Sequence, residues 1–430
     1  MKRRLILPAI ALILIVSWSC SQTSVLKEAS PGSEKVSEDR LNRIDNMLQQ
    51  YIDSGWTAGA VGFISRNGKI VYDKSFGVND IESKSLMNKD DIFRIASQTK
   101  AITSIAVMML FEEGKFLLDD PISKYIPEFA NSTVLDKFNE NDSSFTTVPA
   151  NRRITIRDLL THTSGIDYAG IGSRSMKAIY EKAGIPGAFG GDKNVLGDKI
   201  RALGKLPLVH QPGEKFTYGL NVDVLGYLVE ILSGETLDQY FQKHIFEPLG
   251  MVDTYFYLPS SKFNRLVKVS TEDDNHKLVN ATGESINYPM VTGTYYSGGA
   301  GLSSTIKDYA IFLQMLLNKG EYNGKRLLAP RTVELITSNQ IGDLNYGVDK
   351  FGLGFQITST RGQAKSGVSE GSFGWGGYFA TIYWVDPTEH LVCLLFMQQS
   401  PLRHSEIQEK FRVLVYQSLT DLSQDKADDN

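Results

Sequence analysis

Apolar residues recur at helical spacing soon after the start of the chain, and two short apolar runs follow them. Between positions 41 and 52 they fall three and four residues apart, behind a possible helix cap at Ser37. The two runs, 60–65 and 69–76, flank Asn67-Gly68, a dipeptide that suits a type I′ hairpin turn. The pattern therefore predicts an amphipathic surface helix followed by two antiparallel strands.

The stretch 97–113 is apolar on nearly every side and is closed by Gly114, as in a helix at the centre of a domain. The middle of the chain predicts further helices separated by long polar loops: helices at 156–161, 222–233 and 237–245, and loops at 131–153 and 166–195. The last third predicts two helices, three strands and a terminal amphipathic helix, at 306–318 and 330–338, at 351–359, 379–385 and 391–398, and at 407–419.

A helix and hairpin at one end of the chain, with strands and a helix at the other, favour one sheet built from both ends. We expect an α+β fold in which residues 38–115 and 300–420 form an antiparallel sheet flanked by helices. The region 116–299 is expected to be a mainly helical insertion within one domain, 38–420. The acidic tail, 421–430, is expected to be disordered.

Composition and charge exclude some functions. The chain has 430 residues, 42% of them hydrophobic, and a formal net charge of −4. This balance provides no basic surface for a phosphate backbone, so nucleic acid is not an expected partner. The six histidines show no metal-binding spacing, and we expect no metal or other cofactor. Cys393 lies in an apolar run and is expected to be a core residue without a disulfide.

The first residues have the pattern of an export signal. A basic start precedes an apolar run, 5–16, that is short for a membrane span of about 20 residues. Small residues then precede Cys20, which resembles the lipoprotein cleavage site of bacteria. We expect a signal peptide at 1–19, lipidation of Cys20, a tether at 20–37 and a location in the bacterial cell envelope, with the membrane contacted only through the lipid. Plain secretion and an uncleaved anchor are the alternatives.

The candidate chemistry begins where the apolar helix starts, because Ser97 and Lys100 are three residues apart there. Side chains at i and i+3 share a helix face and can meet. A serine is a poor nucleophile until a neighbouring base takes its proton, and a lysine can do this once burial lowers its pKa. The same spacing occurs after Ser24, Ser304 and Ser423, but only Ser97 opens a nearly all-apolar helix. Ser97 is therefore the candidate nucleophile.

The segment around Ser97, Phe93-Arg94-Ile95-Ala96-Ser97-Gln98-Thr99-Lys100, resembles the first active-site element of the serine beta-lactamases and penicillin-binding proteins, in the branch near class C. Further segments follow in that family's order, at 156–165, 212–218, 298–304 and 374–377. The resemblance covers residues 38 to 420. It implies a beta-lactamase-like fold and the transfer of an acyl group to a serine.

By this resemblance, Tyr218 matches the tyrosine that lies beside the nucleophile and lysine and shuttles protons. A tyrosine next to an ammonium ion suits this task, since the positive charge lowers its pKa. The family's Tyr-x-Asn form is not kept, because Asn221 comes one position late, and we assign Asn221 no role. His162 falls in a family segment whose histidine is structural, so a Ser-His-Asp triad is not expected.

The third element of lactam-binding members has Lys or His, then a hydroxyl residue, then Gly. Here Trp375, Gly376 and Gly377 stand in its place and look like the version in the family VIII carboxylesterases. The resemblance implies that these three residues contact the substrate. It also implies that the backbone N–H groups of Ser97 and Tyr378 form the oxyanion hole.

The leading hypothesis is a serine hydrolase that forms an acyl-enzyme at Ser97 and hydrolyses a small-molecule ester, or an amide. One alternative is a D-Ala-D-Ala peptidase or beta-lactamase with the same machinery. Another is a lipoprotein that keeps the fold for binding or sensing without turnover. The set of Ser97, Lys100 and Tyr218 favours an enzyme, and the element at Trp375 favours esters over lactams. The sequence leaves the oligomeric state open.

Overall fold

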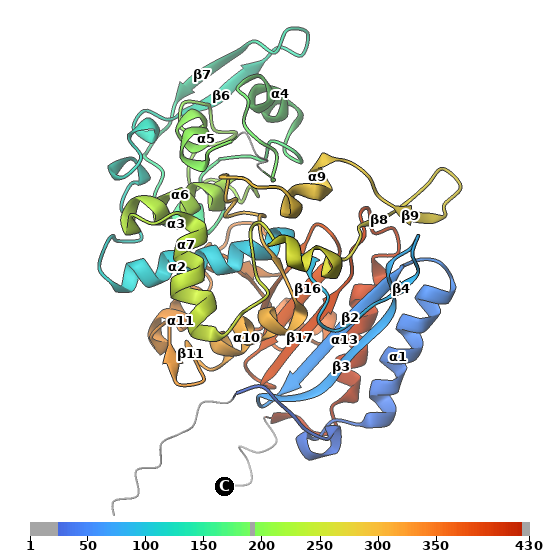
Figure 1. Ribbon diagram of the computed structural model, residues 1–430. Helices are drawn as coiled ribbons and strands as arrows, with labels where there is room; N and C mark the ends of the chain where they lie inside the picture. Colours follow the sequence, from blue (N-terminus) through green and yellow to red (C-terminus); the bar gives the residue numbers. More distant parts are fainter. Residues whose placement is uncertain (1–24, 190–193, 424–430) are drawn as a thin grey trace, which may run out of the picture.

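The computed structural model describes residues 25–189 and 194–423. Its centre is a nine-stranded sheet to which both ends of the chain contribute (Figure 1). Eight strands lie in one row, in the order β1 (Lys27–Glu28), β3 (Lys69–Asp80), β2 (Gly59–Arg66), β17 (Leu391–Phe396), β16 (Thr381–Asp386), β15 (Phe373–Gly377), β14 (Gln356–Ile357) and β13 (Lys350–Phe351). The ninth, β4 (Ser85–Leu86), pairs with β3. All pairs are antiparallel except that β1 lies parallel to β3, so the predicted α+β architecture is confirmed.

The hairpin of β2 and β3 forms as the sequence predicts. Arg66 pairs with Lys69 across a two-residue turn. Asn67 and Gly68 have φ of 55° and 73°, the positive values that a type I′ turn requires. Asparagine and glycine tolerate this left-handed conformation better than other residues do, which is why the dipeptide predicts the turn.

Helices α1 (Glu38–Asp53) and α13 (Glu406–Ser418) cover one face of the sheet side by side (Figure 1). The apolar stripe of α1 is buried, and the side chain of Ser37 caps the helix by accepting from the backbone N–H of Arg40. Cys393 projects from β17 into this layer and is fully buried, as predicted. Strand residues of alternating parity thus fill two separate cores, one on each face of the sheet.

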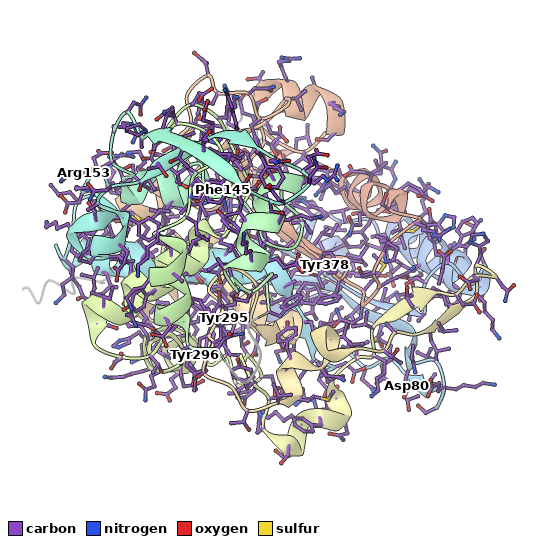
Figure 2. All side chains as sticks on the ribbon, turned by 90° about the horizontal axis from the view of Figure 1, so that it is seen from above. Asp80, Phe145, Arg153, Tyr295, Tyr296 and Tyr378 are labelled. Atoms are coloured by element: carbon purple, nitrogen blue, oxygen red, sulfur yellow. The ribbon has the colours of Figure 1, made fainter. Side chains whose placement is uncertain are left out.

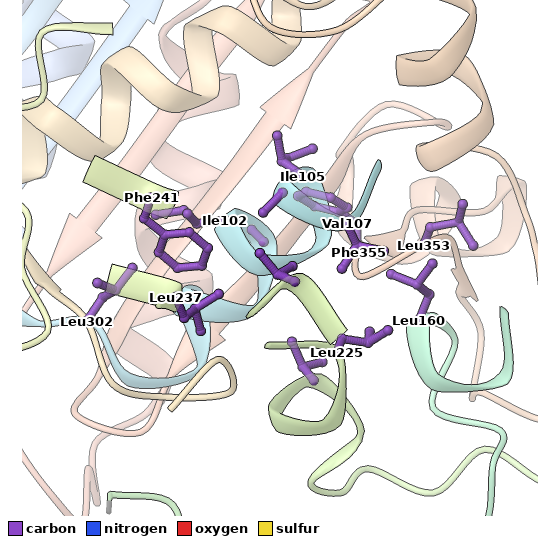
Figure 3. Close-up of a cluster of buried hydrophobic side chains, with 14 of the residues drawn as sticks. Ile102, Ile105, Val107, Leu160, Leu225, Leu237, Phe241, Leu302, Leu353 and Phe355 are labelled. Carbon is purple, nitrogen blue, oxygen red and sulfur yellow. The ribbon is translucent and has the colours of Figure 1, made fainter. Parts of the chain in front are cut away.

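The other face carries α10 (Ile306–Leu317), and beyond it lies α2 (Thr99–Glu112) at the centre of the larger core. Nearly every residue of α2 is buried, and helix α6 (Asn221–Ser233) packs along it. Figure 3 shows the apolar side chains that surround α2, which come from the helical region and from the two segments on either side of α10. A helix that is apolar all round is therefore enclosed on all sides, as its sequence predicts.

The region between the two halves of the sheet is mainly helical, as expected. Its helices are α3 (Ile156–Leu160), α4 (Arg174–Lys182), α5 (Leu196–Leu203), α6, α7 (Leu237–Phe241), α8 (Glu247–Leu249) and α9 (Glu284–Asn287). After it come α11 (Pro330–Ile336) and α12 (Thr360–Ser366). The short strand pairs outside the main sheet are β5 (Phe93–Arg94) with β10 (Ser303–Ser304), β6 (Thr133–Phe138) with β7 (Phe145–Pro149), β8 (Ser270–Glu272) with β9 (Leu278–Asn280), and β11 (Glu321–Tyr322) with β12 (Lys325–Arg326).

Three local predictions were wrong. The expected loop at 131–153 contains the hairpin β6–β7, whose second strand is exposed throughout, so its polar composition hides the strand pattern (Figure 2 labels Phe145 on it). The expected loop at 166–195 contains α4, which buries only three residues at helical spacing. The expected strand at 351–359 is the hairpin of β13 and β14, because Gly354 reverses the chain with a φ of 93°.

The predicted tether is wrong for the part that the structure describes. Residues Lys27 and Glu28 form the edge strand β1, and Val36 is buried and bridges to Leu419. The tail also begins later than predicted, since Asp421 pairs with a buried arginine of β2. Residues 1–19 and Cys20 lie outside the described residues. Within 25–189 and 194–423, no helix has the length and apolar character needed to cross a membrane.

Candidate active site

Ser97 stands in a strained turn between a strand and the central helix. Strand β5 ends at Arg94, residues Ala96–Gln98 form one turn of 3₁₀ helix, and α2 begins at Thr99. Ala96 has a φ of 42°, a left-handed conformation that is rare for a residue with a Cβ. Such strain persists only where the surrounding structure imposes it, and it is common at functional sites.

The structure brings Ser97, Lys100 and Tyr218 together. The hydroxyl of Tyr218 donates to Ser97 Oγ across 2.7 Å, and Lys100 Nζ lies 3.4 Å from the same oxygen. Lys100 reaches it from the first turn of α2, whereas Tyr218 comes from the loop before α6. A serine oxygen in contact with two groups that can exchange protons is the arrangement of an activated nucleophile.

Lys100 is 3% exposed and has few polar contacts. Besides Ser97 Oγ, its ammonium group donates to the carbonyl of Gly299 across 2.7 Å. It also lies 4.5 Å from the ring centre of Tyr218 and 5.4 Å from that of Tyr168. No carboxylate of the described residues lies within ion-pair distance of it.

Tyr218 is oriented by a buried network behind it. His162 accepts at Nδ1 from the side chain of Asn221 across 3.0 Å, and its carbonyl accepts from the N–H of Thr217 across 2.7 Å. Burial, together with the charge of Lys100, lowers the pKa of His162 well below its ordinary value, so the ring is neutral. Its ring centre lies 5.0 Å from that of Tyr218, and among the described residues it has no hydrogen bond with Ser97.

Asn221 points inward rather than toward Ser97. Its side chain accepts from the hydroxyl of Ser164 and donates to His162 and, across 3.4 Å, to the carbonyl of Ile166. With all these partners buried, Asn221 holds the loop that carries Tyr218. Asn221 comes one position later than the asparagine of the family's Tyr-x-Asn form, and its side chain bonds to the buried residues behind Tyr218.

The glycine-rich element forms strand β15 beside the nucleophile. A Cβ added to Gly377 would lie 2.5 Å from the carbonyl oxygen of Ile95, so the end of β15 lies directly against the turn that holds Ser97. Trp375 packs against the ring of Tyr218 at 5.6 Å between centroids. The next residue after the strand, Tyr378, is 58% exposed (Figure 2). The C-terminal end of β15 thus lies beside the turn that holds the nucleophile.

A comparison with protein families identifies the group to which this arrangement belongs. The family model described as "Beta-lactamase" matches residues 44–417, nearly the whole of the described chain. The chain belongs to the beta-lactamase family. It is a serine hydrolase, as the sequence predicts.

Individual members of the beta-lactamase family agree with this assignment over most of their length. A putative D-alanyl-D-alanine carboxypeptidase of Escherichia coli is 30% identical, the alignment covering 89% of this chain and 88% of the relative. The lovastatin esterase of Penicillium rubens is 32% identical over 70% of this chain and 73% of the relative. The solved structure of EstCE1, a hydrolase with promiscuous acyltransferase activity, shares the fold with a TM-score of 0.76, at 24% identity over 88% of this chain and 99% of that one.

Sequence reasoning missed one charged group close to Lys100. Asp223, in the first turn of α6, is fully buried and accepts from the hydroxyl of Ser297 across 2.7 Å and from the N–H of Gly299 across 3.4 Å. Burial raises its pKa, while the bond from Ser297 and the charge of Lys100 act in the opposite direction. The available signal was an acidic residue in the first turn of a mostly apolar helix.

Tyr168 was also missed, because no motif contains it. Its ring stacks on Tyr218 at 5.5 Å and 29°, and burial raises its pKa well above the ordinary value. Tyr168 and Tyr218 therefore form one aromatic wall beside the Lys100 ammonium group, which favours a cation by the charge distribution of the rings.

Two lysines that precede β15, Lys350 and Lys365, have no hydrogen bond or ion pair with Ser97 or Tyr218 among the described residues. Lys350 donates to the carbonyl of Gly342 across 2.7 Å and lies 3.6 Å from Asp343. Lys365 lines a cavity of about 580 Å³ that Arg412 of α13 also lines, on the face of the sheet opposite to α2. Among residues 25–189 and 194–423, no group of three or more His, Cys, Asp or Glu is arranged to hold a metal ion.

Proposed function

We propose that this enzyme hydrolyses small neutral carboxylic esters through an acyl-enzyme formed at Ser97. The observation that carries the proposal is the contact of Ser97 Oγ with both Tyr218, at 2.7 Å, and Lys100, at 3.4 Å. The lovastatin esterase, whose name describes ester cleavage, supports the choice of an ester. Tyr218 and Lys100 act as the proton-transfer pair.

In acylation, the proton of Ser97 Oγ passes to the pair while Oγ bonds to the carbonyl carbon of the ester. The π electrons of the carbonyl move onto its oxygen and give a tetrahedral oxyanion. When this species collapses, the bond to the leaving oxygen breaks and the pair returns the proton to it. An alcohol departs and an acyl group remains on Ser97.

Deacylation repeats these steps with water. The pair takes a proton from a water molecule as the water oxygen bonds to the acyl carbon. Collapse then breaks the bond to Ser97 Oγ, which regains a proton from the pair, and the carboxylic acid leaves. Both half-reactions pass through an oxyanion, so fixed N–H donors are needed.

We assign those donors to the backbone N–H groups of Ser97 and Tyr378. The support is the close approach of β15 to the turn before Ser97, where a Cβ on Gly377 would lie 2.5 Å from the carbonyl of Ile95. A side chain at Gly377 would collide with the turn that precedes the nucleophile. Bare backbone there leaves room for the substrate carbonyl.

The preference for neutral esters follows from the lack of a positively charged side chain at the Trp375 position of β15. Trp375 has no positive charge and packs against Tyr218 and Phe351, and neither Lys350 nor Lys365 bonds to Ser97 or Tyr218 among the described residues. A charge-assisted hydrogen bond to a substrate carboxylate is worth roughly 1.5–3 kcal/mol. Without it, anionic substrates such as penicillins and D-Ala-D-Ala peptides should bind about ten- to a hundredfold more weakly.

The test combines active-site labelling with a substrate panel. A fluorophosphonate probe should label the wild type and fail to label Ser97→Ala. p-Nitrophenyl esters of short acids should be turned over at least about tenfold better, in kcat/KM, than a chromogenic cephalosporin. Labelling of Ser97→Ala would require another nucleophile. Equal or better turnover of the cephalosporin would replace the ester proposal with a beta-lactamase.

A peptidase is the second candidate, because the relative in Escherichia coli carries the name of a putative D-alanyl-D-alanine carboxypeptidase. The same acyl-enzyme chemistry would serve it. Release of D-alanine from a D-Ala-D-Ala peptide at a rate comparable to ester hydrolysis would favour this function. If the probe does not label the wild type and no substrate is turned over, the remaining hypothesis is a protein that binds or senses a ligand without catalysis.

We also propose export and attachment to the cell envelope through a lipid on Cys20. The support is the basic start, the short apolar run and the small residues before Cys20. Cys20→Ala should release the enzyme from membranes into the soluble fraction, as followed by fractionation and immunoblotting. Unchanged membrane association of Cys20→Ala would exclude the lipid anchor.

A further inference from the structure

Asp223 is a buried carboxylate whose interactions are incomplete. Its Oδ1 accepts two hydrogen bonds, from Ser297 and Gly299, but Oδ2 has no hydrogen-bond partner among the described residues. It also forms no ion pair with the described residues. A buried carboxylate loses much of its hydration free energy, so a charge left this way needs compensation from a nearby cation.

The turn that Asp223 holds is the one that holds Lys100. The N–H of Gly299 donates to the carboxylate on one side of the residue, and its carbonyl accepts from the ammonium group on the other. A Cβ added to Gly299 would lie 2.4 Å from Asp223 Oδ2 and 3.5 Å from Lys100 Nζ. The unpartnered carboxylate oxygen and the ammonium group therefore face each other across a residue that has no side chain.

We propose that Asp223 is a positioning residue that acts through Lys100: it orients the Ser297–Gly299 turn that binds the ammonium group and supplies the buried negative charge that balances it. This inference rests on the proposed function, since it assigns a partner to a residue of the proton-transfer pair. Gly299 is part of the arrangement because any side chain there would occupy the space between the two charges.

Besides Asp223, the titratable groups that the described residues place near Lys100 are His162, which is neutral, and the tyrosines Tyr168 and Tyr218. Asp223 is thus the buried carboxylate that faces the ammonium group across Gly299. Two unit charges about 5 Å apart interact by a few kcal/mol at the effective dielectric of a protein interior, equivalent to about one to two pH units.

The test is the pH dependence of acylation in Asp223→Asn. Asparagine has nearly the same shape and can still accept from Ser297, so the turn keeps one of its bonds while the charge is lost. We expect the rising limb of kcat/KM for a p-nitrophenyl ester to move about one to two units toward lower pH. The maximum of kcat should fall about tenfold, with KM changed by less than about threefold.

Two further variants separate charge from structure. Gly299→Ala places a methyl group against Oδ2 and should move the same limb in the same direction by a smaller amount, which also provides a test if Asp223→Asn does not fold. Asp308→Asn is the matched control, because Asp308 is another buried carboxylate, which accepts from Asp253 and Thr254 and whose charged neighbours are Asp253 and Lys262 rather than Lys100. Its pH profile should equal that of the wild type.

The outcomes distinguish this inference from the function on which it rests. If the wild type is not labelled at Ser97 by the fluorophosphonate probe, the proposed function fails. If the wild type is labelled and Asp223→Asn shows the wild-type pH profile, then Asp223 has no role through Lys100 and the esterase proposal stands. A lower kcat with an unmoved profile in both Asp223→Asn and Gly299→Ala also rejects the balancing charge.

Discussion

Two buried cations, Arg66 and Lys100, differ in how the fold neutralises them. Arg66 at the end of β2 has a nearly buried guanidinium that pairs with Glu389 at 2.8 Å and with Asp421 at 2.7 Å. The same group donates to backbone carbonyls of the N-terminal segment at Glu34. Lys100 contacts one carbonyl and one hydroxyl, and its carboxylate neighbour lies beyond ion-pair distance.

The difference separates a structural use of charge from a chemical one. The guanidinium of Arg66 joins the two ends of the chain, so its planar set of donors is used in full. A lysine that is to exchange protons with a substrate must instead keep a donor position open. Replacing the fully paired Arg66 should therefore mainly lower the stability of the fold, whereas replacing the incompletely paired Lys100 should mainly lower the rate of the reaction.

The largest effect on stability is expected for Arg66→Met, which leaves Glu389 buried without its cation. Removing one member of a buried pair typically lowers the free energy of unfolding by about 3–5 kcal/mol. Urea denaturation should show this loss, while kcat/KM per folded molecule stays within about threefold. The control is Arg331→Met, which removes an exposed pair with Glu334 and should cost less than about 1 kcal/mol. If Arg66→Met also lowers the free energy of unfolding by less than about 1 kcal/mol, the buried pair is no more important for stability than an exposed one.

Lys100→Ala and Tyr218→Phe should mainly lower the rate, whereas Arg66→Met mainly lowers the stability. Each is expected to lower kcat/KM about a hundredfold, equivalent to about 2.7 kcal/mol of barrier. The double variant should lose little more than either one, because the residues act as a unit on Ser97. Steady-state kinetics and urea denaturation on the same samples compare rate with stability. Additive losses of rate, or a loss of stability in Tyr218→Phe as large as that in Arg66→Met, would contradict the distinction.

A buried anion without any cation in contact provides the smallest and sharpest test. Among the described residues, the Asp308 carboxylate accepts only from the N–H of Asp253 and the hydroxyl of Thr254, and burial raises its pKa from 3.8 to about 6. The charge of Asp253 also raises the pKa of Asp308 and the charge of Lys262 lowers it, but both effects are smaller than that of burial. Between these pH values the folded protein binds a proton that the unfolded chain has released, so the free energy of unfolding falls as the pH rises.

Asp308→Asn should remove this contribution. Relative to the wild type, the variant should gain about 2 kcal/mol of unfolding free energy on going from pH 4.5 to pH 7, from the shift of about two units. Denaturation curves at the two pH values measure the difference. Parallel behaviour of variant and wild type would mean that Asp308 is ionised in the fold without cost.

The agreement between sequence and structure depended on how local each feature is. The Asn67-Gly68 turn and the all-apolar helix after Ser97 were predicted because backbone preference and periodicity act within a few residues. The hairpin β6–β7 was missed because an exposed strand has no apolar face to mark it. The docked segment at Val36 was missed because its partner, Leu419, lies at the other end of the chain.

The sequence by itself determined the α+β architecture and the family, and it singled out Ser97, Lys100 and Tyr218 as the candidate set, because ordered motifs and side-chain periodicity lie along the chain. Only the tertiary structure decided what surrounds Lys100. The carbonyl of Gly299 and the carboxylate of Asp223 reach it from separate segments, across a glycine that leaves the space between the charges open. Such electrostatic surroundings depend on distances of a few ångströms and on the exclusion of water, and both arise only when those segments pack together.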